Sequence, residues 1–567
     1  MLAALFGLSS VADAFFLGFL IPNLFRRLFG EGALTAAFLP PYARLRQTHP
    51  RAAGAFATRT VLLLIGVGMA LAVAAALALS IPALTERLDD KADLALNLTR
   101  VMILYAPLVC GAALIAAVLQ TAGRFVVPAV SPVILNGAMI AAALAWSSRA
   151  PEQAAMAIAV GVVAAGVIQT GLHLLAARKD LGSRHAVRQD PVAQTALRDA
   201  SRTTRRTLAP IVLGLAVFQI NALLDALLAF VFSPPQELST DAASAAGVSG
   251  GAPGGGGASG GGGTSGGGPL GLPVEHPVRV GAVAALQWAQ RLYQFPLGVF
   301  GIAIATAIFP ALAKAVRKPD ESQTNQNGNR ADFRGQPGPD FLPTLRQGLR
   351  LTLFIGLPAS AGLLLVRTPL VRVIYEHGIF TAEDTGRVAA LLAAYGASVW
   401  AYSLIHVLTR AFYALGEPKT PVKAAVAAVG LNLALNLTLI WPLGALGLAL
   451  STAISAAFQA VLLAVWLQRR LRRSGVIQND GAASEPNGSM INASVRRSWG
   501  RSLLATAVMG LVIGLAPLAL GVDPTAGSFA HAVALLAGQA VAGAGVYFAF
   551  AGLGRWEELR WLLRRGG

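Results

Sequence analysis

Long apolar stretches recur along this sequence and limit the folds open to it. A bilayer's hydrocarbon core is about 30 Å thick, and a helix needs roughly 20 apolar residues to cross it. Strands of a membrane barrel would be about half as long and would alternate polar with apolar residues. The sequence therefore predicts an all-α polytopic membrane protein with about thirteen complete spans after a short apolar start. The expected spans are 10–40, 57–83, 96–121, 126–147, 153–177, 208–232, 280–313, 351–374, 388–414, 422–441, 444–467, 502–521 and 528–553.

Composition and charge agree with a membrane protein. Hydrophobic residues make up 55% of the 567 residues and charged residues 13%, which is far from the usage of soluble domains. A net charge of +18 could suggest nucleic-acid binding, but the Lys and Arg residues gather in alternate loops. The positive-inside rule places those loops and the C-terminus in the cytoplasm. Membrane topology thus accounts for the charge, and no nucleic-acid partner is expected.

An internal repeat divides the chain into halves. FGEGALTAAFLPPYARLR from Phe29 matches FGIAIATAIFPALAKAVR from Phe300, and GRFVVP from Gly123 matches GEPKTP from Gly416. Both matches relate helices six apart, and an even offset preserves direction through the membrane. We therefore expect two six-helix lobes as parallel repeats, an arrangement that transporters use. The first half opens with only MLAALFG where the second opens with a full helix, so the first helix is expected to be partial.

The expected domain organisation follows from these spans and loops. It comprises an N-lobe at 1–178, a basic cytoplasmic loop at 179–206, a C-lobe at 207–468 with a Gly-rich insertion at 233–278, a second basic loop at 469–499, a final helix pair at 500–553 and a cytoplasmic tail at 554–567.

Ionisable residues within the apolar stretches are the first functional candidates, because a charge at mid-bilayer costs roughly 2.5–3.5 kcal/mol on insertion scales. Arg27 has Glu31 at i+4 as a local ion-pair partner. At the same spacing Arg26 has Gly30, so it lacks a local anion. This favours a role in substrate binding over snorkelling of the side chain to the membrane surface. Arg291 lies on the equivalent helix of the second repeat. Two such guanidinium forks facing one cavity would suit a diphosphate, although an interhelical hydrogen bond is the alternative for Arg291. The candidates are Asp13, Arg26, Arg27, Glu31, Asp225 and Arg291.

Polar residues of the second half form another candidate set. Asp225, the i,i+4 pair Asn432 and Asn436, and Thr452 could supply hard oxygen ligands to a cation such as Na⁺. Ordinary interhelical hydrogen bonding is the favoured alternative.

Covalent chemistry has little support in the sequence. Cys110 is the one cysteine and lies in an apolar stretch, and the histidines show no metal-binding spacing, so neither a metal nor another cofactor is expected. Asp89 and Asp90, in ERLDDKADL, are the one carboxylate pair that would suit a membrane enzyme, and their mixed-charge setting indicates a solvated loop. We therefore expect no enzyme.

Several segments resemble the MurJ (MviN) family of lipid II flippases. They include ADAFFLGFLIPNLFRRLFGEGALTAAFLP from Ala12, RLYQFPLGVFGIAIATAIFPAL from Arg291 and RAFYALGEPKTPVK from Arg410, and the similarity runs to about Trp466. The resemblance implies a MATE-like exporter fold of fourteen helices, whose last two, here about 502–553, border a groove for a polyprenyl tail. It also implies a protein of the bacterial inner membrane that works by alternating access in peptidoglycan synthesis, with cell-wall synthesis proteins as candidate partners. Undecaprenyl-diphosphate-linked disaccharide-pentapeptide would move from the cytoplasmic to the periplasmic leaflet, with Na⁺ or the membrane potential as candidate driving forces.

The same resemblance assigns roles to single residues. Asp13, Arg26, Arg27, Glu31 and Arg291 fall on cavity positions of the family, and Asp225, Asn432, Asn436 and Thr452 fall on a sodium site that some members carry. The sequence departs from the family pattern where the first-helix arginines would precede Met1, where Gln294 replaces a glutamate, and in the Gly-rich tract. An exporter of another lipid-linked oligosaccharide or of drugs, and a non-transporting scaffold, remain alternatives.

Overall fold

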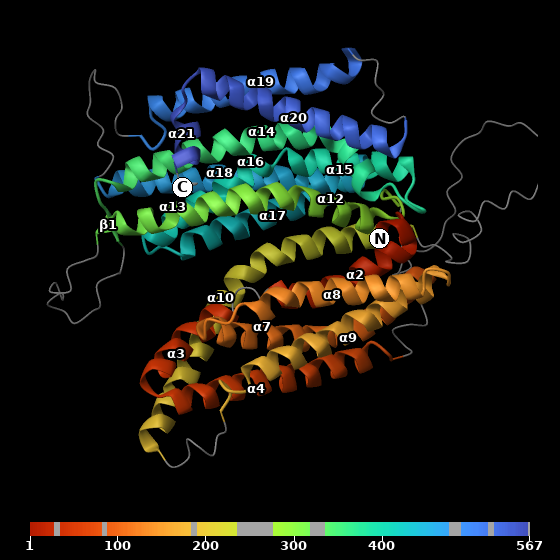
Figure 1. Cartoon of the computed structure of the whole chain (residues 1–567), viewed down its shortest axis with the longest axis vertical. Helices are drawn as coiled ribbons and strands as arrows, with labels where there is room; N and C mark the ends of the chain where they lie inside the picture. The colour runs from red at the N-terminus through yellow and green to blue at the C-terminus, as the bar shows by residue number, and fades with distance from the viewer. Residues whose placement is uncertain are drawn as a thin grey trace, which may run out of the picture. The chain divides into compact units, whose positions relative to one another are not determined.

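Helices account for almost all of the structure, as the apolar stretches require. The structure is a computed structural model, and it describes residues 1–27, 34–81, 88–182, 190–234, 276–317, 335–475, 489–519 and 527–564. The chain divides into two compact units, drawn with their helices in Figure 1. The first unit comprises Met1–Ala284 with His377–Phe380, and the second comprises Ala285–Glu376 with Thr381–Gly567. The Gly-rich tract lies almost wholly outside the described residues.

The first unit consists of α-helices in its described part. They are α1 (Leu2–Phe6), α2 (Ser10–Phe25), α3 (Leu34–Thr48), α4 (Pro50–Ala78), α6 (Asp90–Met102), α7 (Tyr105–Thr121), α8 (Val126–Ala145), α9 (Pro151–Ala177) and α10 (Pro191–Val231), followed by the first turn of α12 (Ala282–Pro296).

The second unit holds the remainder of α12 and the helices that follow it. These are η3 (Leu297–Ile302), α13 (Ala303–Lys314), α14 (Phe341–Tyr375), α15 (Ala382–Gly396), α16 (Val399–Ala414), α17 (Lys419–Leu443), α18 (Ala445–Arg473), α19 (Ala493–Ala519), α20 (Phe529–Leu553) and α21 (Glu557–Arg564), with the two-residue antiparallel strands β1 (Val316–Arg317) and β2 (Gln336–Pro337).

Membrane spans agree with the all-α expectation. Within the described residues, eleven helical segments are long and apolar enough to cross a bilayer, and Ser10–Phe25 and Gln219–Val231 are two shorter apolar helices. The sum, 11 + 2 = 13, equals the number of stretches read from the sequence. The polytopic all-α fold is confirmed.

Among the expected spans that the structure describes in full, three contain a break. The span at 388–414 is interrupted at Ala397 and Ser398, between α15 and α16, and proline accounts for the other two breaks. The span at 96–121 is interrupted at Ile103, the residue whose carbonyl the ring of Pro107 would meet in a continuous helix. The span at 280–313 changes after Pro296 into the six-residue π-helix η3, because a proline removes one backbone donor.

Helix α10 begins earlier than the apolar pattern indicates. Its 41 residues start at Pro191, inside the segment expected as a basic loop. The Asp190 carboxylate accepts hydrogen bonds from the backbone N–H groups of Val192 and Ala193, each at 3.0 Å, and a proline suits the first helical position. Capping therefore extends the helix through polar sequence.

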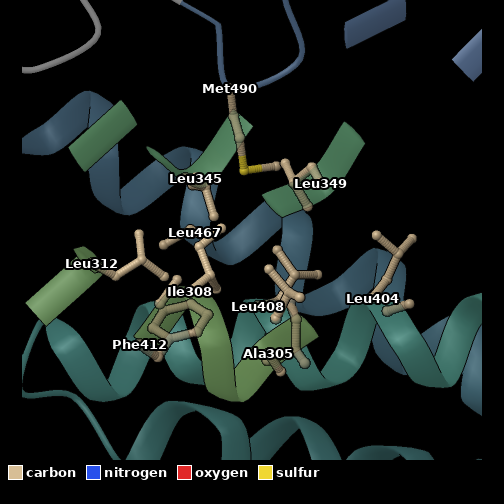
Figure 2. Close-up of a cluster of buried hydrophobic side chains, with 14 of the residues drawn as sticks. Ala305, Ile308, Leu312, Leu345, Leu349, Leu404, Leu408, Phe412, Leu467 and Met490 are labelled. Atoms are coloured by element: carbon tan, nitrogen blue, oxygen red, sulfur yellow. The ribbon is translucent and has the colours of Figure 1, made fainter. Parts of the chain in front are cut away.

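The core of the second unit forms where α13, α14, α16 and α18 meet. Figure 2 shows Ile308 and Leu312 of α13 against Leu345 and Leu349 of α14, with Phe412 of α16 on the same cluster. Lipid tails are as apolar as leucine, so close packing, more than water exclusion, holds such helices together in a bilayer.

Candidate functional site

Arg26 lies where α2 ends. The helix continues through Pro22 and finishes at Phe25, and Arg26 is its C-terminal cap. The Asn23 Oδ1 atom accepts hydrogen bonds from the Arg26 Nε and Nη2 atoms at 3.2 and 3.0 Å. Asn23 is neutral, so it orients the guanidinium and leaves its charge in place. A cation at this end of a helix is also favoured by the helix dipole.

A cavity inside the first unit lies beside this arginine. Its volume is about 520 Å³, and its lining comes from Arg26 and from the helices α7, α8 and α9, which are labelled in Figure 1. All of these belong to the first unit. Small residues of α7, including Ala112 and Ala116, leave the space open. Among the described lining residues, Arg26 carries the one permanent charge. The cavity is therefore an electropositive space with an apolar wall.

The floor of the cavity is polar and tightly ordered. Gln169 and His173 are 2% and 1% exposed and lie one turn apart on α9. The Gln169 amide donates to the Ser131 carbonyl at 2.5 Å, and the His173 Nδ1 atom lies 2.6 Å from the Gln169 carbonyl. The Gln169 Oε1 atom has no hydrogen-bond partner among the described residues. A ligand with hydrogen-bond donors would match this acceptor, and one with an anionic group would match Arg26.

Gln169 and His173 are not among the site residues predicted from the sequence. A signal for them exists, because a Gln-x-x-x-His pair inside the apolar stretch 153–177 places two polar groups on one helix face. Polar side chains of this kind within a membrane helix are expected to face protein or a cavity.

Asp13 lies in a different environment from Arg26. It is fully buried, and its two carboxylate oxygens accept hydrogen bonds from the backbone N–H groups of Gly281 and Ala284, both at 2.9 Å. Its carboxylate also lies 3.7 Å from the ammonium of the buried Lys91, which donates to the Ser233 hydroxyl. Asp13 thus caps the first turn of α12, and the cavity described above does not include it.

Close packing at this cap requires glycine at position 281. Gly281 has φ +80°, and a Cβ atom there would lie 2.2 Å from the Leu8 carbonyl oxygen. Both the backbone conformation and the available space exclude a side chain.

Of the two predicted cavity residues that follow Arg26, the structure describes only Arg27. Arg27 is half-buried in the turn that follows α2. Glu31 lies outside the described residues, so its expected ion pair with Arg27 stays a prediction.

Arg291 lies on α12 in the second unit and is exposed. Its guanidinium carbon is 5.2 Å from the ring centre of Trp288. Trp288 is itself held by Tyr375, whose hydroxyl donates to the Trp288 carbonyl at 3.3 Å and whose ring lies 5.0 Å away. The guanidinium of Arg291 is therefore within cation–π distance of a tryptophan that a second aromatic residue holds in place.

The residues proposed to hold a cation fall in both units. Asp225 is 2% exposed on α10 of the first unit. In the second unit the Asn436 amide donates to Asn432 Oδ1 at 2.9 Å, and the Asn432 amide lies 3.3 Å from the Thr452 hydroxyl. The bonds among these three are those of ordinary interhelical packing, and a shared cation site stays a prediction.

Two minor expectations concern Asp89 and Cys110. The Asp89 carboxylate accepts from the Ala92 N–H at 3.2 Å and caps α6, which is a structural use of this residue. Cys110 is 3% exposed in α7.

Known proteins of one family match this chain along most of its length. The family described as "Lipid II flippase MurJ" matches residues 2–241 and 276–521. A "Probable lipid II flippase MurJ" of Rhizobium meliloti (strain 1021) is 30% identical, over 97% of this chain and 89% of the relative. The protein of the same description from Vibrio cholerae is 29% identical, over 90% of this chain and 89% of the relative.

Solved structures show the same fold. A "Lipid II flippase MurJ, inward closed conformation" superposes with a TM-score of 0.65 at 19% identity, over 97% of this chain and 94% of the other. An inward-facing multidrug resistance MATE family transporter of the MOP superfamily gives 0.56 at 14% identity, over 85% and 94% of the two chains. With the family match spanning most of its residues, the chain belongs to the lipid II flippase MurJ family.

Proposed function

We propose that this protein is a lipid II flippase. It moves undecaprenyl-diphosphate-linked disaccharide-pentapeptide from the cytoplasmic to the periplasmic leaflet of the inner membrane by alternating access. The observation that carries the proposal is the family match over 2–241 and 276–521, supported by an arginine at the edge of an internal cavity. Transport of this kind needs no bond to be made or broken, so the protein acts without enzymatic chemistry.

Arg26 and Arg291 are the residues assigned to the diphosphate. The Asn23 amide oxygen accepts hydrogen bonds from the Arg26 guanidinium, and the Arg291 guanidinium lies beside the ring of Trp288. Two guanidinium forks can grip phosphate oxygens bidentately. Arg27 supplies a second positive charge directly after Arg26 in the sequence, and the role of Glu31 stays a prediction from the sequence. Asp13 caps the start of the helix that carries Arg291.

The charges of the headgroup and of a bound cation determine how the membrane potential acts on transport. Each elementary charge that crosses the bilayer is worth about 2.3 kcal/mol per 100 mV. A cytoplasm-negative potential therefore favours outward movement of an anionic headgroup. Inward movement of a cation held near Asn432, Asn436 and Thr452 would also be favoured by this potential.

Complementation of a flippase-depleted bacterium tests the assignment. Wild type should restore growth, whereas Arg26→Ala and Arg291→Ala should fail, because each removes a contact to the diphosphate. Hydrogen bonds to charged groups contribute about 1.5–3 kcal/mol, so transport should fall at least about tenfold. Arg26→Lys keeps the charge and loses the fork, and its activity should be intermediate.

Arg149→Ala is the matched control, since Arg149 is exposed beyond α8. Immunoblots of tagged protein must show equal membrane levels for all variants. Full rescue by both Arg26→Ala and Arg291→Ala would refute their role in binding. Failure of wild-type protein to move fluorescent lipid II in proteoliposomes would refute the function itself.

A further inference from the structure

A second charged cavity lies in the second unit, away from the residues discussed above. Its volume is about 340 Å³, and it is lined by the start of α19, the turn between α20 and α21, and Arg350 of α14. Five arginines line it, Arg350, Arg497, Arg501, Arg555 and Arg560, against two glutamates. The net charge of the lining is therefore 5 − 2 = +3.

The two glutamates are both engaged by one arginine. Glu558 is buried, and its Oε1 atom accepts from Arg350 Nε at 2.7 Å and from the Ser498 hydroxyl at 2.6 Å. Glu557 Oε2 lies 2.9 Å from Arg350 Nη2. Arg350 also stacks 4.8 Å from the ring centre of Trp561. The acids thus neutralise Arg350 and build one wall of the cavity.

The other four arginines have no acidic partner within 4.0 Å in the described part of the chain. Arg497 and Arg501 are exposed and lie four residues apart on one face of α19, a spacing at which like charges repel. An anion between them would relieve this repulsion.

Arg555 adds a conformational cost at the same place. It is the one non-glycine residue with positive φ in the described structure, at +48°. The Trp556 N–H donates to the Ala551 carbonyl and the Arg555 N–H to the Gly552 carbonyl, both at 3.0 Å. This is the helix ending in which glycine normally takes the left-handed position. Sustained strain at a charged residue is typical of ligand sites.

Apolar residues beside the cavity indicate what carries the anion. Leu504 is 57% exposed and lies three residues after Arg501 and seven after Arg497, on the same face of α19. Leu553, 87% exposed, lies two residues before Arg555 at the end of α20. The apolar segment of α19 begins there. A cationic pocket beside exposed leucines at a helix end matches a phosphate with acyl chains attached.

We propose that this cavity binds the phosphate of an anionic phospholipid. Arg497, Arg501, Arg555 and Arg560 hold the phosphate oxygens, and the acyl chains lie along Leu504 and Leu553. This site is distinct from the cavity at Arg26, so it does not depend on the proposed transport function.

Thermal unfolding of the purified full chain in detergent tests the proposal. Phosphatidylglycerol should raise the melting temperature of wild type, and phosphatidylcholine should not. Arg501→Gln with Arg555→Gly should lose most of that rise, because it removes two phosphate ligands while glycine relaxes the turn. Arg560→Gln alone should halve the rise in melting temperature. This single variant tests the proposal if the double variant does not fold.

Two controls separate the alternatives. Arg472→Gln with Arg473→Gln, an arginine pair in the last turn of α18, should keep the full rise, and so should Arg26→Ala. An equal rise in wild type and in Arg501→Gln with Arg555→Gly would overturn the proposal. An equal rise with inorganic phosphate at the same concentration would overturn the lipid assignment and leave a free anion as the ligand.

Discussion

Asp13 and Arg26 lie near the two ends of α2, and each has the charge that the helix dipole favours there. Their surroundings differ in one respect. The carboxylate of Asp13 accepts hydrogen bonds from two backbone N–H groups and lies 3.7 Å from the ammonium of Lys91, whereas the guanidinium of Arg26 donates to the neutral Asn23 amide and borders a cavity. Burial with full hydrogen bonding indicates a structural residue, and an oriented charge at a cavity indicates a binding residue.

Removing the carboxylate of Asp13 should destabilise the fold. Asp13→Asn leaves the ammonium of Lys91, which is 1% exposed, without its anion. Breaking a buried ion pair in this way costs about 3–5 kcal/mol in the free energy of unfolding. Thermal unfolding in detergent should show a large drop in melting temperature.

A double variant identifies the cause of that drop. Asp13→Asn with Lys91→Met removes both charges and should recover part of the lost stability. If the double variant is as unstable as the sum of the two single variants, the Asp13–Lys91 pair does not contribute in this way.

Among the elements, α21 shows how one buried acid can hold a short helix. Its eight residues are too few to be stable alone in water. Glu558 joins the helix to Arg350 of α14 and Ser498 of α19. Burial raises the pKa of Glu558, but the hydrogen bonds from Ser498 and Arg350 outweigh it, and the pKa lies below its usual range.

This pKa shift predicts acid release of α21. A carboxylate with a lowered folded-state pKa stabilises the docked helix above its unfolded pKa of about 4.3, and that stabilisation is lost as the pH falls through the folded value. Hydrogen exchange of 557–564, corrected for intrinsic rates, should therefore accelerate below about pH 4. Glu558→Gln should abolish this dependence, and Glu383→Gln, which changes an exposed acid of α15, should keep it. A Glu558→Gln protein with the wild-type profile would contradict the assignment.

At the scale of the whole molecule, the internal repeat is visible in the backbone. Phe29 and Phe300 are 300 − 29 = 271 positions apart, and the same offset takes Arg26 to Leu297. A π-helical turn begins at each of these two residues, at the end of α2 and at the end of α12. The equivalent helices of the two halves are thus interrupted at equivalent positions. The interruption begins at Arg26 in the first half and six residues after Arg291 in the second.

Membrane orientation gives the prediction for the whole chain. The positive-inside rule predicts that the end of α18 and the C-terminus face the cytoplasm and that the start of α15 faces the opposite side of the membrane. In a Cys110→Ala background, a membrane-impermeant maleimide should label Ala382→Cys in intact spheroplasts. It should label Ser474→Cys only after permeabilisation, and the reverse pattern would invert the topology.

Patterns in the sequence predicted the features that depend on residues close together in the chain. Hydropathy indicated the thirteen apolar segments, and the repeat indicated equivalent helices, because both are read from adjacent residues. Hydropathy did not predict the start of α10, because the Asp190 cap allows this helix to begin in a polar segment. It also treated 280–313 as one helix, since hydropathy does not register the donor lost at Pro296.

By itself, then, the sequence determined a polytopic helical membrane protein of two related halves, with arginines as its unusual intramembrane charges. Only the tertiary structure decided which polar residues share a site. The partners of Asp13 lie 268 and 271 positions away, and Gln169 and His173 reach the cavity of Arg26 through the packing of α9 against α7 and α8. The physical reason is that helix periodicity specifies which residues share a face, whereas the neighbour that covers this face is chosen by packing between distant segments.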